Sequence, residues 1–561
     1  MSLNSTRKCC VLVVMLTTAL CLIVLTHPSA AQEALAPILQ LPLPAQVYAF
    51  GTNPGDPAWA LPSSTMTQGT DGNLYGTTPQ GGSANYGTIF KVTPDGVLTV
   101  VHNFLFDNGP FSCYNGVILA NDGNLYGTCY GVADSQGNVT PGDIYKITPA
   151  GVFTDLHDFS LNGVEGFHCT GIIQGVDGNF YGTTELGATN GSGAFFRMSP
   201  SGVVTVLHVF TTAEASAISA PLIQASDGNF YITSVQGGTN FVGTVLRITP
   251  SGSVTVLRNF ATTDGAYPSA GLLQAKDGSL YGTTLQGASN NMGGVYRIAP
   301  NGVFTLVHSF TQLEADGVYV ALTQGTDGYF YGVSEFGGAT DQGTVFSMDS
   351  SGNLFSWDFG TNPSVFYRPI SAIVQHTNGG YFADTEYGGG ADFGTIYGFS
   401  FAEPPFCRLL PATARVGVKI GILGQGFSTA SVVKFAGVRA TTISLSGTTF
   451  ITATVPPGAR TGNVTVTTGS TTLTSNQPFK VKPVISSFSP TSGPVGTVVR
   501  ITGSGLSQTT IVKFATVRAT SIIVNSDTQV TATVPAGAIS GKISVTTPGG
   551  SASSATAFTV N

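Results

Sequence analysis

Short apolar runs separated by turn residues repeat along most of the chain. In one unit, an extended segment (64–68) leads into an Asp-Gly-Asn turn. Three further apolar segments follow at 74–78, 88–93 and 97–104, separated by Gly-rich or Pro-Asp-Gly turns. Asp-Gly and Gly-Asn supply the positive φ angles that tight hairpins need, and short alternating or apolar runs favour strands. Each unit is therefore predicted to be a four-stranded antiparallel meander.

The turn also sets the period. It begins at Asp71, Asp122, Asp177 and Asp227, returns as Asp-Gly-Ser at Asp277 and Asp-Gly-Tyr at Asp327, and a weaker copy begins at Asn378; the spacings are 51, 55, 50, 50, 50 and 51 residues. Four strands in about fifty residues are typical of a β-propeller blade. The seventh unit lacks a fourth strand, and residues 45–50 resemble the missing one. We expect this N-terminal strand to close the ring and remove both sheet edges, which argues against the alternative of a stacked solenoid.

A second period begins after Pro405. Residues 433–435 (Val-Lys-Phe) and 452–456 (Thr-Ala-Thr-Val-Pro) return 79 residues later at 512–514 and 531–535. Each copy has the length and the Val/Thr alternation of a small β-sandwich. The predicted fold class is all-β: a seven-bladed β-propeller (45–401) followed by two immunoglobulin-like β-sandwich domains (402–482 and 483–561). A signal peptide (1–31) and a linker (32–44) precede the propeller.

Two resemblances follow from these motifs. The Asp-Gly-x-Leu/Phe-Tyr-Gly and Gly-Thr-x-Phe-Lys/Arg motifs of residues 45–401 resemble the GloVer tandem repeat of exported, choice-of-anchor bacterial proteins. That resemblance implies no catalytic residues. Residues 485–494 (Ile-Ser-Ser-Phe-Ser-Pro-Thr-Ser-Gly-Pro) and 503–505 resemble an IPT/TIG domain, and the first copy departs from this opening at 406–411. These domains imply a spacer or adhesive role at the cell surface rather than DNA binding.

The N-terminus predicts export. Arg7 and Lys8 precede an apolar stretch (11–25), and small residues Ser29 and Ala31 stand at the −3 and −1 positions of a cut before Gln32. An uncleaved anchor is the alternative, but the apolar stretch is short for a spanning helix. The protein is expected to be secreted or extracellular at the cell surface, a monomer, without a transmembrane anchor after cleavage.

The net charge limits the kinds of partner that are expected, and the cysteines limit the possible disulfides and zinc sites. The chain has 22 basic and 29 acidic residues and a net charge of −7, so nucleic acid is not an expected partner. Four cysteines remain after signal cleavage, and their spacing matches no zinc pattern. A Cys113–Cys129 or a Cys113–Cys169 disulfide is possible, and all four thiols, including Cys407, could be free.

Candidate chemistry is sparse. Histidines recur at one repeat position (His102, His157, His208 and His308, with Arg258 in a fifth copy), a blade apart, so they are expected to be structural and not one metal site. The Asp-Gly-Asn turns lack the alternating acidic ligands of a calcium loop. No nucleophile elbow stands out. No catalytic residue, metal site or cofactor is predicted, and the assignment leans against an enzyme.

The connections between blades hold the candidate ligand-binding residues. They carry acidic residues (Asp56, Asp107, Glu165, Glu214, Asp264, Glu314 and Asp316) and aromatic residues that are expected at the channel mouth (Trp59, Phe111, Phe167, Tyr267, Tyr319 and Tyr367). Glu185, Glu335 and Glu386 share one position after the second strand. Aromatic faces beside carboxylates suit sugar rings or cationic ligands; otherwise the aromatics fill gaps between blades and the acids are solvated.

The predicted function is a secreted, non-catalytic binding or scaffold protein for a polysaccharide or a cell-surface protein partner, with the immunoglobulin-like domains as stalk or adhesion modules. The alternative is an extracellular carbohydrate-active lyase or hydrolase that uses the mouth carboxylates as acid and base. A third possibility is an assembly platform that binds no small ligand.

Overall fold

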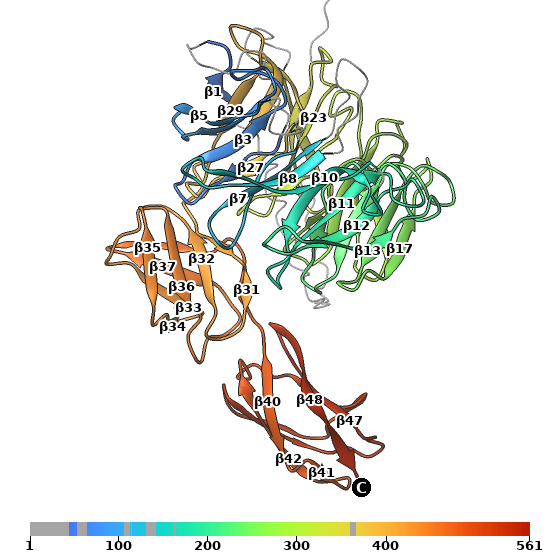
Figure 1. The fold of residues 1–561 in the computed structure, drawn as a ribbon, viewed down its shortest axis with the longest axis vertical. Coiled ribbons are helices and arrows are strands. Elements are labelled where there is room, and N and C mark those ends of the chain that lie inside the picture. Colours follow the sequence, from blue (N-terminus) through green and yellow to red (C-terminus); the bar gives the residue numbers. More distant parts are fainter. Residues whose placement is uncertain are drawn as a thin grey trace, which may run out of the picture. The chain divides into compact units, whose positions relative to one another are not determined.

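The computed structural model describes residues 44–52, 64–105, 113, 115–130, 142–161, 163–359 and 366–561. The predicted signal peptide lies outside these residues. All regular structure in the described part is β, and it contains no helix long and apolar enough to cross a membrane. Figure 1 shows the repeat region from blue to yellow-orange and the two C-terminal sandwiches in orange and red.

The repeat region forms seven antiparallel sheets, six of which take four strands that follow one another along the chain. The first three are β2 (Thr67–Gln68), β3 (Leu74–Thr78), β4 (Thr88–Val92) and β5 (Leu98–Asn103); β6 (Ile118–Leu119), β7 (Leu125–Tyr130), β8 (Gly142–Ile147) and β9 (Phe153–Asp158); and β10 (Phe167–Gln174), β11 (Phe180–Leu186), β12 (Ala194–Met198) and β13 (Val204–Val209). The next three are β14 (Ile223–Gln224), β15 (Phe230–Ser234), β16 (Thr244–Ile248) and β17 (Val254–Asn259); β18 (Leu273–Gln274), β19 (Leu280–Thr284), β20 (Gly294–Ile298) and β21 (Phe304–Ser309); and β22 (Thr323–Gln324), β23 (Phe330–Ser334), β24 (Thr344–Met348) and β25 (Leu354–Asp358).

The seventh sheet combines the two ends of the repeat region. It contains β26 (Phe366–Pro369), β27 (Val374–Gln375), β28 (Tyr381–Gly388) and β29 (Thr395–Phe399), and its outer strand is β1 (Ala45–Ala49) from the N-terminal end. Ala45 pairs with Gly398 and Ala49 with Thr395. The strand missing from the last repeat is thus supplied by the first, and the seven-bladed all-β fold class is confirmed.

The carboxylate of each turn Asp accepts hydrogen bonds from residues of its own hairpin. Oδ1 of Asp71 accepts the backbone N–H of Asn73 (3.2 Å), and Oδ2 accepts the Asn73 side-chain amide (2.8 Å) and the hydroxyl of Tyr75 (2.8 Å). The same three contacts recur at Asp122, Asp177 and Asp227. The Asp-Gly-Asn-x-Tyr motif therefore closes a turn and anchors a buried tyrosine.

A glutamine three residues before the turn connects six of the seven blades to the blade before it. The Oε1 atom of Gln274 accepts the Ser226 N–H (2.8 Å), and Oε1 of Gln68 accepts the Thr377 N–H (3.1 Å) across the junction of blades seven and one. Equivalent bonds reach Gln174, Gln224, Gln324 and Gln375. In blade two the position is Leu119, so the link from blade one has no glutamine.

A threonine six residues after the turn Asp makes a second link between blades. The Thr77 hydroxyl donates to the carbonyls of Cys113 (2.9 Å) and Asn115 (3.1 Å) in the next blade. Thr233 and Thr283 donate in the same way to the next blade. In blade seven the position is Asp384, which is fully buried, and within the described part of the chain no donor meets hydrogen-bond geometry at either of its carboxylate oxygens.

The propeller also holds the disulfide that the sequence left open. Cys113 and Cys129 are bonded to each other within blade two. Cys169 and Cys407 are free and buried.

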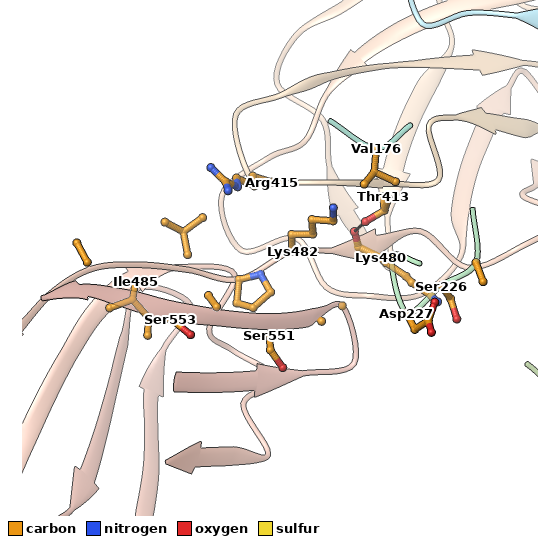
Figure 2. A pocket seen from close by; sticks show the side chains of 18 residues that line it. Val176, Ser226, Asp227, Thr413, Arg415, Lys480, Lys482, Ile485, Ser551 and Ser553 are labelled. Atoms are coloured by element: carbon orange, nitrogen blue, oxygen red, sulfur yellow. Dashed lines mark hydrogen bonds between the residues drawn. The ribbon is translucent and has the colours of Figure 1, made fainter. Parts of the chain in front are cut away.

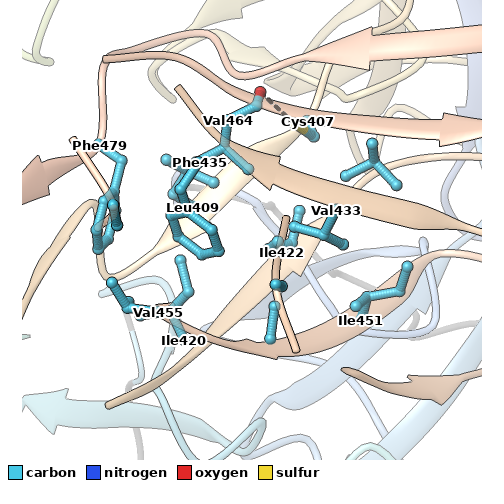
Figure 3. Packing of buried hydrophobic residues seen from close by; sticks show 14 of the residues in the cluster. Cys407, Leu409, Ile420, Ile422, Val433, Phe435, Ile451, Val455, Val464 and Phe479 are labelled. Carbon is cyan, nitrogen blue, oxygen red and sulfur yellow. Dashed lines mark hydrogen bonds between the residues drawn. The ribbon is translucent and has the colours of Figure 1, made fainter. Parts of the chain in front are cut away.

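The two C-terminal domains are sandwiches of the same topology. The first contains β30 (Arg408–Leu410), β32 (Lys419–Leu423), β36 (Phe450–Thr454) and β35 (Ile443–Ser446) facing β34 (Val438–Arg439), β33 (Val432–Phe435), β37 (Val464–Thr468) and β38 (Thr471–Thr474), with the parallel pair β31 (Thr413–Ala414) and β39 (Lys480–Val481). The second contains β40 (Val484–Ser489), β42 (Val498–Ser504), β46 (Gln529–Thr533) and β45 (Ile522–Ser526) facing β41 (Ser492–Gly493), β48 (Gly550–Val560), β47 (Gly541–Thr547), β43 (Ile511–Phe514) and β44 (Val517–Arg518). Figure 3 shows the first core, where Phe435 and Phe479 pack edge to face at 5.0 Å among Ile, Val and Leu side chains.

Candidate functional site

The acidic residues between blades are mostly paired with the outer strand that precedes them. His208 Nε2 lies 3.1 Å from Glu214, His308 Nε2 lies 3.2 Å from Glu314, and His157 Nε2 lies 3.4 Å from Glu165. In the blade where Arg258 replaces histidine, it pairs with Asp264. These carboxylates are therefore occupied by the blade itself, and the expectation that they serve a ligand at the mouth is not supported for these four. Asp56 and Asp107 lie outside the described residues.

Burial and hydrogen bonding act in opposite directions on the pKa values of Glu214 and Glu314. At Glu314, burial raises the pKa. The Thr311 backbone N–H (2.9 Å), the Thr311 hydroxyl and His308 together lower the pKa by more than burial raises it, so the net shift is downward. Glu214 has the same set of partners and the same direction of shift. This histidine–carboxylate pair is a connection that fixes the loop to the blade.

The position eight residues after the first residue of the turn, at or just beyond the end of the second strand's core, carries different residue types in different blades. Its seven residues are Pro79, Tyr130, Glu185, Val235, Leu285, Glu335 and Glu386. The three predicted glutamates fall into two clusters on this ring of positions. One joins blades two and three, and the other joins blades six and seven.

The cluster of blades six and seven is built around Arg368. Its guanidinium donates to Glu335 (2.5 Å), and a second nitrogen lies 3.9 Å from Glu386. The same group lies 4.8 Å from the ring centroid of Phe336 and 5.6 Å from that of Tyr387. Burial and the neighbouring Glu386 raise the pKa of Glu335, while Arg368 opposes them. A cation thus lies between two carboxylates and two aromatic rings.

Two predicted tyrosines border this cluster. Tyr367 stacks on Tyr387, with centroids 5.5 Å apart, and its hydroxyl donates to Asp392 (2.9 Å), which together with burial raises its pKa to about 12. Tyr319 is 44% exposed, and the charges of Glu335, Asp316 and Arg368 all act on its hydroxyl. We call Tyr319, Glu335, Phe336, Tyr367, Arg368, Glu386 and Tyr387 the blade 6–7 cluster.

The cluster of blades two and three has a different composition. The Tyr130 hydroxyl donates to Glu185, and its ring stacks on His168 with centroids 4.0 Å apart. Phe167 meets His168 edge to face at 4.8 Å. Burial lowers the pKa of His168, with Glu185 acting in the opposite direction. His168, Tyr267 and Arg368 each have a positive φ angle, of 60°, 57° and 56°.

The predicted site residues thus have three different outcomes. Tyr319, Tyr367, Glu335 and Glu386 come together in the blade 6–7 cluster, while Phe167 and Glu185 lie in the other cluster. Tyr267 is half-buried in blade five and belongs to neither. Trp59 and Phe111 lie outside the described residues.

Comparison with known proteins identifies the repeats. The sequence profile of the Gloeobacter/Verrucomicrobia repeat matches residues 46–224 and 168–397. The chain belongs to this family. The profile of the IPT/TIG domain matches residues 407–481 and 483–560, so both sandwiches are members, including the first, whose opening departs from the pattern. No curated protein matches the chain.

Solved structures match the chain at low sequence identity and low TM-score. Virginiamycin B lyase from Staphylococcus aureus is 16% identical, with 61% of this chain and 96% of that chain covered and a TM-score of 0.44. A surface glycan-binding protein from Prevotella bryantii is 17% identical over 28% of this chain and 39% of that chain, with a TM-score of 0.21. SGBP-B from a xyloglucan utilization locus in Bacteroides uniformis is 19% identical over 26% and 46%, with a TM-score of 0.15.

Sequence reasoning missed the residues that organise both clusters. Arg368 and Tyr387 directly follow the predicted Tyr367 and Glu386, and His168 follows Phe167. One signal was available: glutamates occupy the same position in two consecutive blades, and such a pair of like charges needs a nearby cation. Arg368 is the single Lys or Arg in the sequence between β25 and β28.

Proposed function

We propose that this protein is a secreted or surface-exposed binding and scaffold protein without catalytic activity. Its propeller presents a ligand surface for a polysaccharide or a cell-surface partner, and the two IPT/TIG domains act as stalk or adhesion modules. The observation that carries the proposal is the blade 6–7 cluster, in which aromatic rings surround a fixed set of hydrogen-bonding charges.

The chemistry of this cluster suits a sugar ring. Aromatic faces stack on the apolar face of a pyranose, while carboxylates and a guanidinium bond its hydroxyls. Tyr319 offers an exposed ring, and Glu335 and Glu386 each retain acceptor capacity beside the single Arg368. Because Arg368 holds both carboxylates, these groups are oriented before a ligand arrives, which lowers the entropic cost of binding.

Glycan and cell-wall polymer arrays test the proposal. The chain from Gln32 onward should bind at least one polymer, and Arg368→Ala and Tyr319→Ala should each weaken that binding about tenfold or more. Arg258→Ala is the matched control, since Arg258 also pairs with a carboxylate and lies 4.3 Å from the ring of Phe304, but on an outer strand. Failure of the parent chain to bind any polymer or surface partner would refute the proposal, as would equal losses in Arg258→Ala and Arg368→Ala.

One observation favours the enzymatic alternative. Glu335 has a raised pKa beside the second carboxylate Glu386, the combination that a general acid and its partner need. Polymers bound on the array should then be shortened on incubation, and Glu335→Gln should abolish the release of new chain ends while leaving binding in place. Polymer that stays intact after prolonged incubation contradicts the enzymatic alternative, and binding is then the proposed role of the cluster.

A further inference from the structure

The first IPT/TIG domain has a basic face on its parallel strand pair. Strands β31 and β39 align Thr413 with Lys480 and Ala414 with Val481, and the Lys482 N–H continues the ladder to the Ala414 carbonyl (2.9 Å). Side chains alternate across a strand. Ala414 and Val481 accordingly enter the hydrophobic core, and the residues on either side of them share the outer face. We call Thr413, Arg415, Lys480 and Lys482 the basic face.

The three cations of this face are not neutralised by ion pairs. Among the described residues, none of them takes part in a salt bridge. Burial lowers the pKa of Lys480, and burial together with the charge of Arg415 lowers that of Lys482. Asp177 acts on Lys482 in the opposite direction, but its oxygens already accept hydrogen bonds from Asn179 and Tyr181.

Figure 2 shows these side chains lining one pocket. Asp227 is also drawn there, and its carboxylate already accepts bonds from Asn229 and Tyr231. Three positive charges on adjacent positions of two strands repel one another. An anion placed among them would relieve that repulsion.

The second IPT/TIG domain provides an internal comparison. Its parallel pair β41–β48 aligns Ser492 with Thr559 and Gly493 with Val560, the same register 79 residues later. The positions equivalent to the basic face are Ser492, Pro494, Thr559 and Asn561, all of them neutral. Because the same strand pair forms without the charges, the fold does not require them.

We propose that the basic face binds a polyanionic polysaccharide through its carboxylate or phosphate groups. Neighbouring positions across the strands are about 5 Å apart, and alternate positions along one strand are about 7 Å apart. Such spacing suits successive charges along a polymer, with the lysines as point charges and Arg415 as a planar fork. The site is separate from the blade 6–7 cluster, so either can fail without the other.

The experiment compares three forms of the chain from Gln32 onward by affinity electrophoresis and calorimetry. The probes are polygalacturonate for carboxylates, inorganic polyphosphate for phosphates, neutral dextran and duplex DNA. The test variant is Arg415→Gln/Lys480→Thr/Lys482→Asn, which copies the neutral character of the second domain. The control is Arg500→Gln/Lys513→Thr/Lys542→Asn, which removes the same charge from exposed positions of the second domain.

We expect the parent chain and the control to bind one or both polyanions, and the test variant to bind about tenfold more weakly. The polyanion that binds more tightly shows whether a carboxylate or a phosphate is the recognised group. No binding to either polyanion, or equal loss in test and control variants, overturns the proposal. Equally tight binding of duplex DNA overturns the assignment to a polysaccharide.

Single variants guard against a folding effect. Lys480→Thr and Lys482→Asn should each weaken binding while the unfolding temperature stays that of the parent chain. A lower unfolding temperature with unchanged binding means that the charges support the domain and not a ligand, and this result also overturns the proposal.

Discussion

Asp384 gives the propeller a stability that depends on pH in an unusual direction. It occupies the position at which five blades have threonine and blade six has Val333. A threonine hydroxyl can donate to the carbonyl of the next blade, as Thr77 does, whereas an ionised carboxylate cannot. Burial raises the pKa of Asp384 to about 8, with a smaller opposing effect of Ser371. We predict that Asp384→Thr stabilises the propeller at neutral pH.

The magnitude follows from the two protonation states. The unfolded carboxyl titrates near 3.8 and the folded one near 8, so the folded state binds one more proton between these values. Its contribution is fully present below pH 3.8 and is lost as the pH rises toward 8, at about 1.4 kcal/mol per pH unit. From pH 5 to pH 7 the parent propeller should therefore lose about 3 kcal/mol that Asp384→Thr retains.

Calorimetry at pH 5 and pH 7 measures this difference on the propeller transition. Asp384→Thr and Asp384→Val should both raise the midpoint at pH 7, by an amount on the order of 3–6 °C, and much less at pH 5. Asp95→Asn is the control, because Asp95 is exposed and its removal should change neither midpoint appreciably. An equal effect of Asp384→Thr at both pH values, or destabilisation at pH 7, refutes the reasoning.

Three further outcomes are expected. Gln274→Leu, which copies Leu119 of blade two, leaves the Ser226 N–H without its acceptor and should cost about 1 kcal/mol of propeller stability in denaturant titrations; an unchanged midpoint would mean that water replaces the bond. Glu314→Gln should lower the free energy of unfolding by about 1 kcal/mol at pH 7. Because the pKa of Glu314 is lowered, this difference from the parent chain should vanish as the pH falls below 4. A pH-independent difference contradicts the assigned pairing with His308 and Thr311. Cys113→Ser/Cys129→Ser removes a cross-link between positions 16 residues apart and should lower the free energy of unfolding by about 3 kcal/mol. Cys169 and Cys407 should resist a maleimide reagent until the chain unfolds, and rapid labelling of either thiol in the folded chain contradicts their burial.

The repeat pattern by itself determined the number and kind of elements. Each Asp-Gly-Asn-x-Tyr run contains both the turn and the tyrosine that its Asp binds, so the side-chain contacts of the turn Asp with Asn and Tyr lie within five residues. The same holds for the second period in the C-terminal domains, where identical runs 79 residues apart form identical strands. Local motifs of this kind can be read from sequence because the interactions that stabilise them are local.

Which charges are available to a ligand was decided only by the tertiary structure. Glu214 and Glu335 are both acidic residues in connections of similar repeats, but one pairs with a histidine six residues earlier and the other with Arg368 from the next blade. The basic face likewise joins residues 65 or more positions apart through one short parallel ladder. Such pairings depend on sheet register and on the approach of neighbouring blades, which the spacing of residues along the chain does not contain.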